Sequence, residues 1–111
     1  MKKIAIPISD NKLSPHFGHC KEFVVCEVED NKIINETILV SPPHEPGILP
    51  KWLSDYGVTD VIAGGMGNRA INLFQQAGIN VFVGAPQQEP KKIINEFLEG
   101  TLVLTGNYCD H

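Results

Sequence analysis

The amino-acid sequence predicts an α/β protein in which a five-stranded mixed sheet is flanked by helices. In the first 40 residues the apolar side chains follow strand patterns, and two of these segments are joined by a two-residue turn. After residue 48, short apolar strands alternate with segments of helical spacing, which is typical of helical crossovers between parallel strands. With 111 residues, the chain is expected to form one domain, 1–111, with a flexible tail at about 106–111.

Three strands are expected in the first 40 residues. Residues 2–8, KKIAIPI, form the first strand, and residues 21–29, KEFVVCEVE, alternate with period two. Asp30 and Asn31 then make a tight turn into residues 32–40, KIINETILV. Because strands joined by two turn-type residues pair antiparallel, the second and third strands are expected to form a hairpin.

Helices and short buried strands are expected to alternate in the second half. The elements are a helix that Pro50 opens and Gly57 ends, a strand at 59–63, a helix from Asn68 to Ala77 with Gly78 as its C-cap, a strand at 79–83, and a helix from Pro90 that Gly100 ends. Each helix carries one apolar stripe that we expect to face the core. The stripes are Leu49, Trp52, Leu53 and Tyr56, then Ala70, Ile71, Phe74 and Ala77, then Ile93, Ile94, Phe97 and Leu98.

The resulting order, β-β-β-α-β-α-β-α, predicts the directions of the strands. Helical crossovers connect parallel strands, so the strands at 2–8, 59–63 and 79–83 should share one direction, and the hairpin returns its second strand to that direction as well. This is the ribonuclease H-like arrangement. Four strands then end at one edge of the sheet, where the loops 9–20, 41–48, 64–68 and 84–89 should gather. Open α/β sheets bind ligands at this edge.

The predicted edge carries side chains suited to metal chemistry. His16, His19 and Cys20 lie in the first of these loops and His44 in the second, so three of the four histidines are expected there. Imidazole and thiolate ligands suit zinc, iron and iron–sulfur species. A loop without metal remains the alternative, because no C-x-x-C motif or local fourth ligand is present. Cys109, in the terminal Cys-Asp-His, is a further candidate ligand if the tail reaches this edge.

A glycine-rich turn, GGMGNR, opens the second predicted helix. Glycines let a ligand approach the backbone, and a helix N-terminus offers N–H donors and positive potential to an anion. The turn matches neither G-x-G-x-x-G nor the Walker A motif, so it does not indicate a nucleotide site. The alternative is a tight turn that needs positive φ angles, with its methionine only packing. The candidate binding residues are Gly64, Gly65, Met66, Gly67, Asn68 and Arg69.

Composition disfavours several classes of function. The net charge is −4 and the nine Lys and Arg are scattered, which argues against nucleic acid as a partner. No apolar run approaches the roughly 18–20 residues that span a membrane, and the start of the chain has no signal-peptide pattern, so a cytoplasmic location is expected. The three cysteines are too few for a disulfide framework, and Cys26, in the middle of a strand, is expected in the core.

Two motifs, together with the order of elements, resemble a known family. SPHFG at 14–18 and GGMGNRA at 64–70, after the start KKIAIPIS, are similar to the dinitrogenase iron–molybdenum cofactor biosynthesis family, which includes NifX, NafY and the C-terminal domain of many NifB proteins. The resemblance covers essentially the whole chain. It implies a ribonuclease H-like fold, carriage of an iron–sulfur or iron–molybdenum cluster between donor and acceptor proteins, and no catalysis. The pattern carries over to Phe17, Gly18, Gly64, Gly65, Gly67 and Arg69.

Two other functions remain to be weighed against a cluster carrier. A small anion-binding or protein-interaction module without metal would use the same edge of the sheet. A nuclease would need several carboxylates that converge on divalent metal near the ends of central strands. Asp10 follows the first strand suitably, but Asp60 lies near the wrong end of its strand. A nuclease is therefore disfavoured, since fold analogy alone does not establish function.

Overall fold

The computed structural model describes residues 2–9, 12–13, 22–40, 48–102 and 104. This part of the chain forms an α/β fold with a mixed sheet of five main strands, one additional two-residue strand and three helices. The strands are β1 (Lys2–Ser9), β2 (Lys12–Leu13), β3 (Glu22–Glu29), β4 (Lys32–Val40), β5 (Asp60–Ile62) and β6 (Asn80–Phe82). The helices are α1 (Ile48–Asp55), α2 (Asn68–Gln76) and α3 (Pro90–Glu99). Of these helices, none is long and apolar enough to cross a membrane.

The strand directions agree with the sequence prediction. The strands are arranged in the order β4-β3-β1-β5-β6, and β2 pairs with β1. β3 is antiparallel to both β1 and β4, whereas β5 is parallel to β1 and β6 is parallel to β5. The carboxyl ends of β1, β4, β5 and β6 therefore lie at the same edge of the sheet, which we call the rim.

The β3–β4 hairpin is confirmed by its backbone. Asp30 and Asn31 have φ angles of 53° and 61°, the left-handed values that a two-residue hairpin turn requires and that Asp and Asn tolerate. Pairing begins next to the turn at Glu29 and Lys32, and one register shift follows between Glu27 and Val28. The turn chemistry thus fixes the register along which β4 joins the sheet.

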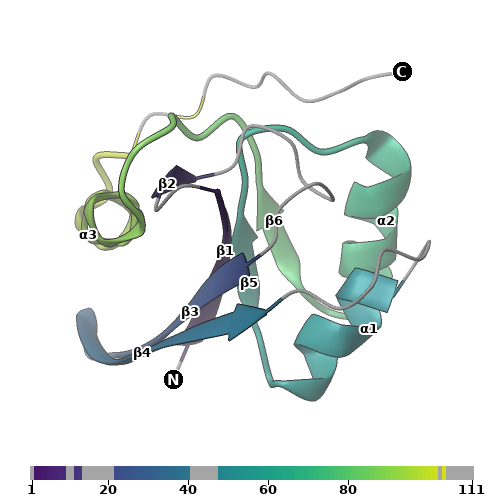
Figure 1. Cartoon of the computed structure of the whole chain (residues 1–111), viewed down its shortest axis with the longest axis horizontal. Coiled ribbons are helices and arrows are strands. Elements are labelled where there is room, and N and C mark those ends of the chain that lie inside the picture. Colours follow the sequence, from purple (N-terminus) through teal and green to yellow (C-terminus); the bar gives the residue numbers. More distant parts are fainter. Residues whose placement is uncertain (1, 10–11, 14–21, 41–47, 103, 105–111) are drawn as a thin grey trace.

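The two faces of the sheet bury separate cores (Figure 1). α1 and α2 lie against one face and α3 against the other. The alternation along β3 assigns its side chains to these faces: Phe23 and Val25 belong to the core under α1 and α2, whereas Val24, Cys26 and Val28 belong to the core under α3. Because both faces of the central strands are covered, β1 is apolar almost throughout, with the residues from Ile4 to Ile8 buried.

The strand β2 was not predicted. The sequence analysis assigned residues 9–20 to a connection, but Lys12 and Leu13 pair antiparallel with Ser9 and Ile8 of β1. Leu13 is buried in the core under α3, and its N–H donates to the Gln88 carbonyl at 3.0 Å. A strand of two residues is too short to show a periodic pattern in the sequence. Its pairing depends on this contact with a distant residue.

The helix ends differ slightly from the expectation. α1 begins at Ile48, before Pro50, which a helix tolerates in its first turn because the first N–H groups have no intrahelical acceptor. Ala77 was expected in the core but is exposed, since α2 ends at Gln76 and Ala77 lies in the capping turn. Tyr56, also assigned to a core-facing stripe, is 45% exposed, although its ring contacts Trp52 edge-to-face.

Candidate functional site

The rim has the topology of a ligand site. From β1 the chain continues to β3 on one side, and from β5 it continues to β6 on the other, so the connections diverge between β1 and β5. Open α/β sheets place ligands at such a switch point, outside the carboxyl ends of the strands. The described parts of the rim are the loop from Ala63 to Gly67 and the loop from Val83 to Glu89.

All of the predicted metal ligands lie outside the described residues, as do the neighbouring Phe17 and Gly18. His16, Phe17, Gly18, His19 and Cys20 fall in 14–21, His44 in 41–47 and Cys109 in 105–111. These assignments stay predictions. Within the described ranges, no group of three or more His, Cys, Asp or Glu could hold a metal ion.

The described residues do fix where the first of these segments is attached. Leu13, which precedes it, pairs with Ile8 of β1 on one side, and Glu22, which follows it, pairs with Ile8 on the other. Glu22 also pairs with Val40, the last residue of β4, from which 41–47 departs. Both histidine-bearing segments therefore begin or end next to the carboxyl end of β1.

The β5–α2 loop is held firmly at the rim. The Ala63 N–H donates to the Phe82 carbonyl at 2.8 Å, the Gly84 N–H donates to the Gly64 carbonyl at 2.9 Å, and the Ala85 N–H donates to the Ala63 carbonyl at 3.1 Å. Met66 is 2% exposed and belongs to the core under α1 and α2, so its packed side chain holds the loop against the core. The loop is thus a preformed part of the structure.

The backbone angles of this loop distinguish between the two roles weighed for its glycines. Positive φ occurs at four of the described glycines, Gly57, Gly78, Gly84 and Gly100. Gly64, Gly65 and Gly67 are absent from that set, and Gly67 has φ −68°. A turn that requires left-handed backbone therefore does not explain these three glycines. Gly67 is the N-cap of α2, a position where glycine is among the favoured residues. For Gly64 and Gly65 the remaining physical reason is space, either for close packing or for a ligand that approaches the backbone.

The start of α2 is suited to an anion. Gly67 is the N-cap with an extended backbone, and among the described residues it has no side-chain cap hydrogen bond. The Ile71 N–H makes the first intrahelical bond, to the Gly67 carbonyl at 3.0 Å. The first turn has no acidic residue, and Arg69 is exposed. The positive end of the helix dipole and the guanidinium therefore both favour a negative ligand here.

Sequence reasoning missed one residue of the rim, Gln88. Its N–H donates to the Pro86 carbonyl at 2.9 Å, and its carbonyl accepts the Leu13 N–H, which joins the β6–α3 loop to β2. Its side-chain Oε1 is buried and has no hydrogen-bond partner among the residues that the structure describes. A lone glutamine in a loop carries no motif, so no sequence signal pointed to it.

Cys26 is confirmed as a core residue. It is 1% exposed, and burial, followed by the nearby Glu36 carboxylate, raises the pKa of its thiol from 9.0 to about 11. Its side chain packs among the apolar side chains under α3, away from the rim. Cys26 is therefore not a candidate ligand.

Asp60 lies away from the rim, as the sequence predicted. It is the first residue of β5, at the opposite end of the strand. Its buried carboxylate accepts hydrogen bonds from the Thr59 hydroxyl at 2.7 Å and from Asn80 Nδ2 at 3.0 Å. This carboxylate joins β5 to β6 and does not face the ligand edge.

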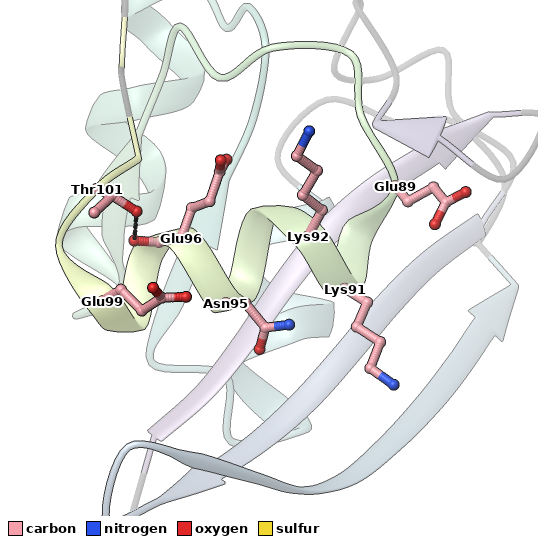
Figure 2. Close-up of a pocket in the computed structure, with 7 residues that line it drawn as sticks. All are labelled: Glu89, Lys91, Lys92, Asn95, Glu96, Glu99 and Thr101. Atoms are coloured by element: carbon pink, nitrogen blue, oxygen red, sulfur yellow. Dashed lines mark hydrogen bonds between the residues drawn. The ribbon is translucent and has the colours of Figure 1, made fainter.

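A separate depression on α3 does not have the character of a binding site. It has a volume of about 450 Å³ and is lined by Glu89, Lys91, Lys92, Asn95, Glu96, Glu99 and Thr101. Figure 2 shows these side chains pointing in different directions from one helix and the turn that follows it. Ligand sites are mostly apolar with a few convergent polar groups. This surface, which lacks both, is a solvated helix face.

These observations define the protein as an α/β fold with a preformed, anion-suited loop at the switch point of its sheet. The chain belongs to the dinitrogenase iron–molybdenum cofactor family, whose model matches residues 1–100. Members of this family generally bind cofactors rather than catalyse reactions.

Similar proteins agree with this assignment. MJ0580 of Methanocaldococcus jannaschii is 36% identical over 107 residues, which cover 92% of this chain and 90% of that protein. The crystal structure of PH0822 is 31% identical, covers 95% of this chain and 96% of its own, and superposes with a TM-score of 0.88. The apo form of the orange protein from Desulfovibrio gigas is 23% identical over 96% of this chain and 95% of its own, with a TM-score of 0.76, and this likeness concerns the fold.

Proposed function

We propose that this protein binds an iron–sulfur or iron–molybdenum-type metallocluster as transient cargo, receives it from a donor protein and passes it to an acceptor protein, without catalysis of its own. One observation carries the proposal: the β5–α2 loop has glycines that left-handed backbone does not explain, at an uncapped helix start beside Arg69. Such a loop suits a bulky anion that comes close to the backbone. Membership of a cofactor family supports a cluster as that anion.

Two parts of the rim would share the cargo. Gly64 to Arg69 would hold its negative charge through backbone N–H groups and the guanidinium. His16, His19 and Cys20, with Phe17 and Gly18 beside them, would supply ligands, because their segment is attached on both sides of Ile8 at the end of β1. His44 and Cys109 are weaker candidates. Imidazole and thiolate are suitable donors for iron.

The small number of proposed ligands fits a carrier. A cluster held by a complete cage of four protein ligands is released slowly, whereas cargo must leave for an acceptor. Few ligands on an open edge leave coordination positions at which an acceptor can attack. The charge of the cargo is then balanced by the helix start and Arg69 rather than by further covalent bonds.

The first experiment is anaerobic reconstitution with iron and sulfide, followed by iron analysis and visible absorption. Wild type is compared with the His16→Ala/His19→Ala/Cys20→Ala variant, and Cys26→Ala is the matched control because it removes a buried cysteine. We expect stoichiometric iron and charge-transfer absorption in wild type and control, and loss of both in the triple variant. A colourless, iron-free wild type would end the carrier proposal.

A second pair of variants tests the anionic part of the site. Arg69→Gln removes an exposed positive charge at the start of α2, and Lys51→Gln removes one from the exposed surface of α1. Net charge changes equally in both variants. We expect faster loss of cluster iron to a chelator only in Arg69→Gln. Equal rates in the two variants would show that general charge, not this position, affects the cargo.

The second candidate function is a small anion-binding or protein-interaction module without metal. The observation that favours it is that the glycines, the helix start and Arg69 of the β5–α2 loop could bind an anion without any metal. Inorganic phosphate that binds wild type but not Arg69→Gln, together with failure of reconstitution, would establish it.

A nuclease is not favoured. The strand order, with β3 reversed, supports the ribonuclease H-like description. However, the Asp60 carboxylate is buried and hydrogen-bonded at the end of β5 away from the rim. We therefore propose the fold description without the activity, and magnesium-dependent nucleic acid cleavage that Asp10→Asn abolishes would contradict this.

A further inference from the structure

β4 leaves one side of the sheet open. It is the last strand in the order β4-β3-β1-β5-β6 and pairs only with β3 within the described residues. Proteins usually protect such an edge with short strands, prolines, β-bulges or several charged side chains, and the one irregularity in the pairing of β4 lies near its turn, between the pairs Asn35–Glu27 and Ile33–Val28. β4 has nine residues and no proline, and its charges are Lys32 at its first position and Glu36. From Thr37 to Val40 the strand is uncharged.

The exposed side of β4 is also unusually apolar. Five large hydrophobic side chains of the described chain are exposed, and three of them lie on this strand: Ile34 at 51%, Ile38 at 57% and Val40 at 74%. Ile38 pairs with Val24, which belongs to the core under α3, so its side of the sheet is the α3 side. In Figure 1, α3 stands apart from β4, in agreement with the exposure of Ile38 and Val40.

We propose that the edge of β4 pairs with the β4 edge of a second copy of this chain, in an antiparallel arrangement with two-fold symmetry. A two-fold interface requires a patch that complements itself, and an apolar strand meets that condition. The Glu36 N–H donates to Asn35 Oδ1 at 3.0 Å and would have to exchange this bond, whereas the other outward N–H and C=O groups of the edge can form a ladder directly, so that the two sheets become continuous. The inference is independent of the cargo proposed for the rim.

The charge pattern excludes one register of this pairing, and the remaining side chains favour an axis at Thr37. A two-fold axis at Glu36 would place two like charges opposite each other, which is destabilising. An axis at Thr37 places Glu36 opposite Ile38 and Thr37 opposite Thr37 of the second copy, and it places Ile34, which lies at the register shift of β4, opposite Val40. Cross-strand apolar and Thr–Thr pairs are favourable. The axis at Thr37 therefore uses residues 34–40 without a repulsive pair.

The size of the pairing predicts a weak dimer. Seven paired residues extend over about 24 Å, and a sheet edge about 10 Å deep gives roughly 240 Å² of contact per copy before side chains are counted. This is well below a standard interface of about 800 Å² per partner, so the association belongs to the transient class. We expect exchange between monomer and dimer that depends on protein concentration.

Sedimentation velocity from about 10 to about 500 µM, a range suited to transient association, tests the proposal. Ile38→Lys adds a charge to the paired edge, and Tyr56→Lys is the matched control, since it replaces an exposed apolar residue of similar accessibility on another surface. We expect increasing average mass in wild type and Tyr56→Lys, and monomer throughout in Ile38→Lys. Unfolding curves verify that both variants are folded. Monomeric wild type over the whole range, or association unchanged in Ile38→Lys, would overturn the proposal.

The register is tested separately by cysteine cross-linking. Opposed residues of an antiparallel pair have Cβ atoms about 4.5–5.5 Å apart, and a small shift of the strands brings them into the range of roughly 3.5–4.5 Å that a disulfide requires. Thr37→Cys should therefore form covalent dimers under mild oxidation much faster than Asn35→Cys, with the native cysteines present in both. Equal rates would refute the axis at Thr37.

Discussion

The two glycines at the ends of α2 should respond in opposite ways to substitution. Gly67, the N-cap, has φ −68° and ψ 156°, a conformation open to any residue. Gly78, just beyond the C-cap, has φ +80°, which favours glycine. We predict that Gly67→Ser stabilises the fold and weakens cargo binding, whereas Gly78→Ala destabilises the fold and leaves binding unchanged.

The magnitudes follow from the backbone. Replacing a glycine at a compatible φ stabilises by about 0.4–1 kcal/mol through the unfolded state, and an N-cap hydroxyl adds a few tenths. Gly67→Ser should thus gain about 0.7–1.3 kcal/mol. At Gly78 a Cβ would meet no heavy atom within 4 Å, so the effect of alanine is conformational only. Left-handed backbone costs an L-residue about 1–2 kcal/mol.

Urea unfolding followed by fluorescence measures the stability term. The single tryptophan, Trp52, packs edge-to-face against Phe23 and Tyr56, so unfolding changes its surroundings. Chelator competition after reconstitution measures binding in the same samples. If Gly67→Ser keeps full binding or loses stability, then Gly67 is not needed to leave space for a ligand. The proposed ligand role of the β5–α2 loop would then be refuted.

Three further predictions concern the core and its edges. Burial, and then the Glu36 carboxylate, raise the pKa of the Cys26 thiol above its unfolded value of 9.0 to about 11. The protonated thiol therefore contributes fully to the unfolding free energy below pH 9.0, and this contribution is lost as the pH approaches about 11. Between about pH 8 and pH 10.5, wild type should lose roughly 2 kcal/mol relative to Cys26→Ala, and parallel curves would contradict this. Lys3→Met removes the hydrogen bond that Lys3 Nζ donates to the Tyr56 carbonyl at 2.7 Å, and it should lower the unfolding free energy by about 1 kcal/mol. An unchanged urea midpoint would show that water replaces this hydrogen bond without loss of stability. Phe74→Ala empties a fully buried site and should cost about 3–5 kcal/mol, with Phe74→Leu much milder; equal losses would argue against a packed site.

The features predicted correctly from sequence are those that local chemistry determines. The hairpin follows from Asp30 and Asn31, which tolerate left-handed backbone. Gly100 takes φ +76° at the end of α3, so its role as a helix stop is also local. The parallel strands follow from helical crossovers, and they in turn place the loop from Gly64 to Arg69 at the rim. Topology therefore positioned this part of the site before any contact was known.

The features that were missed depend on contacts between distant residues. β2 exists because Leu13 is buried under α3 and bonded to Gln88, 75 positions away, and neither residue signals this locally. Ala77 continues the apolar spacing of α2, but the helix ends one residue earlier. The signs of the φ angles at Gly64, Gly65 and Gly67 could not be predicted either, because glycine permits both.

Self-association through β4 and cargo binding at the rim make compatible demands on the molecule. Val40 ends β4 at the rim, and antiparallel pairing about Thr37 directs the two copies of β4 in opposite directions. The two Val40 residues then lie six residues apart along the ladder, about 20 Å at a rise of 3.4 Å per residue. Each rim therefore faces solvent at its own end of the shared edge, and an acceptor can reach one without displacing the other copy. Iron bound per chain should consequently be equal in wild type and Ile38→Lys. A site shared between copies would instead lose half or more of its iron when the dimer is broken.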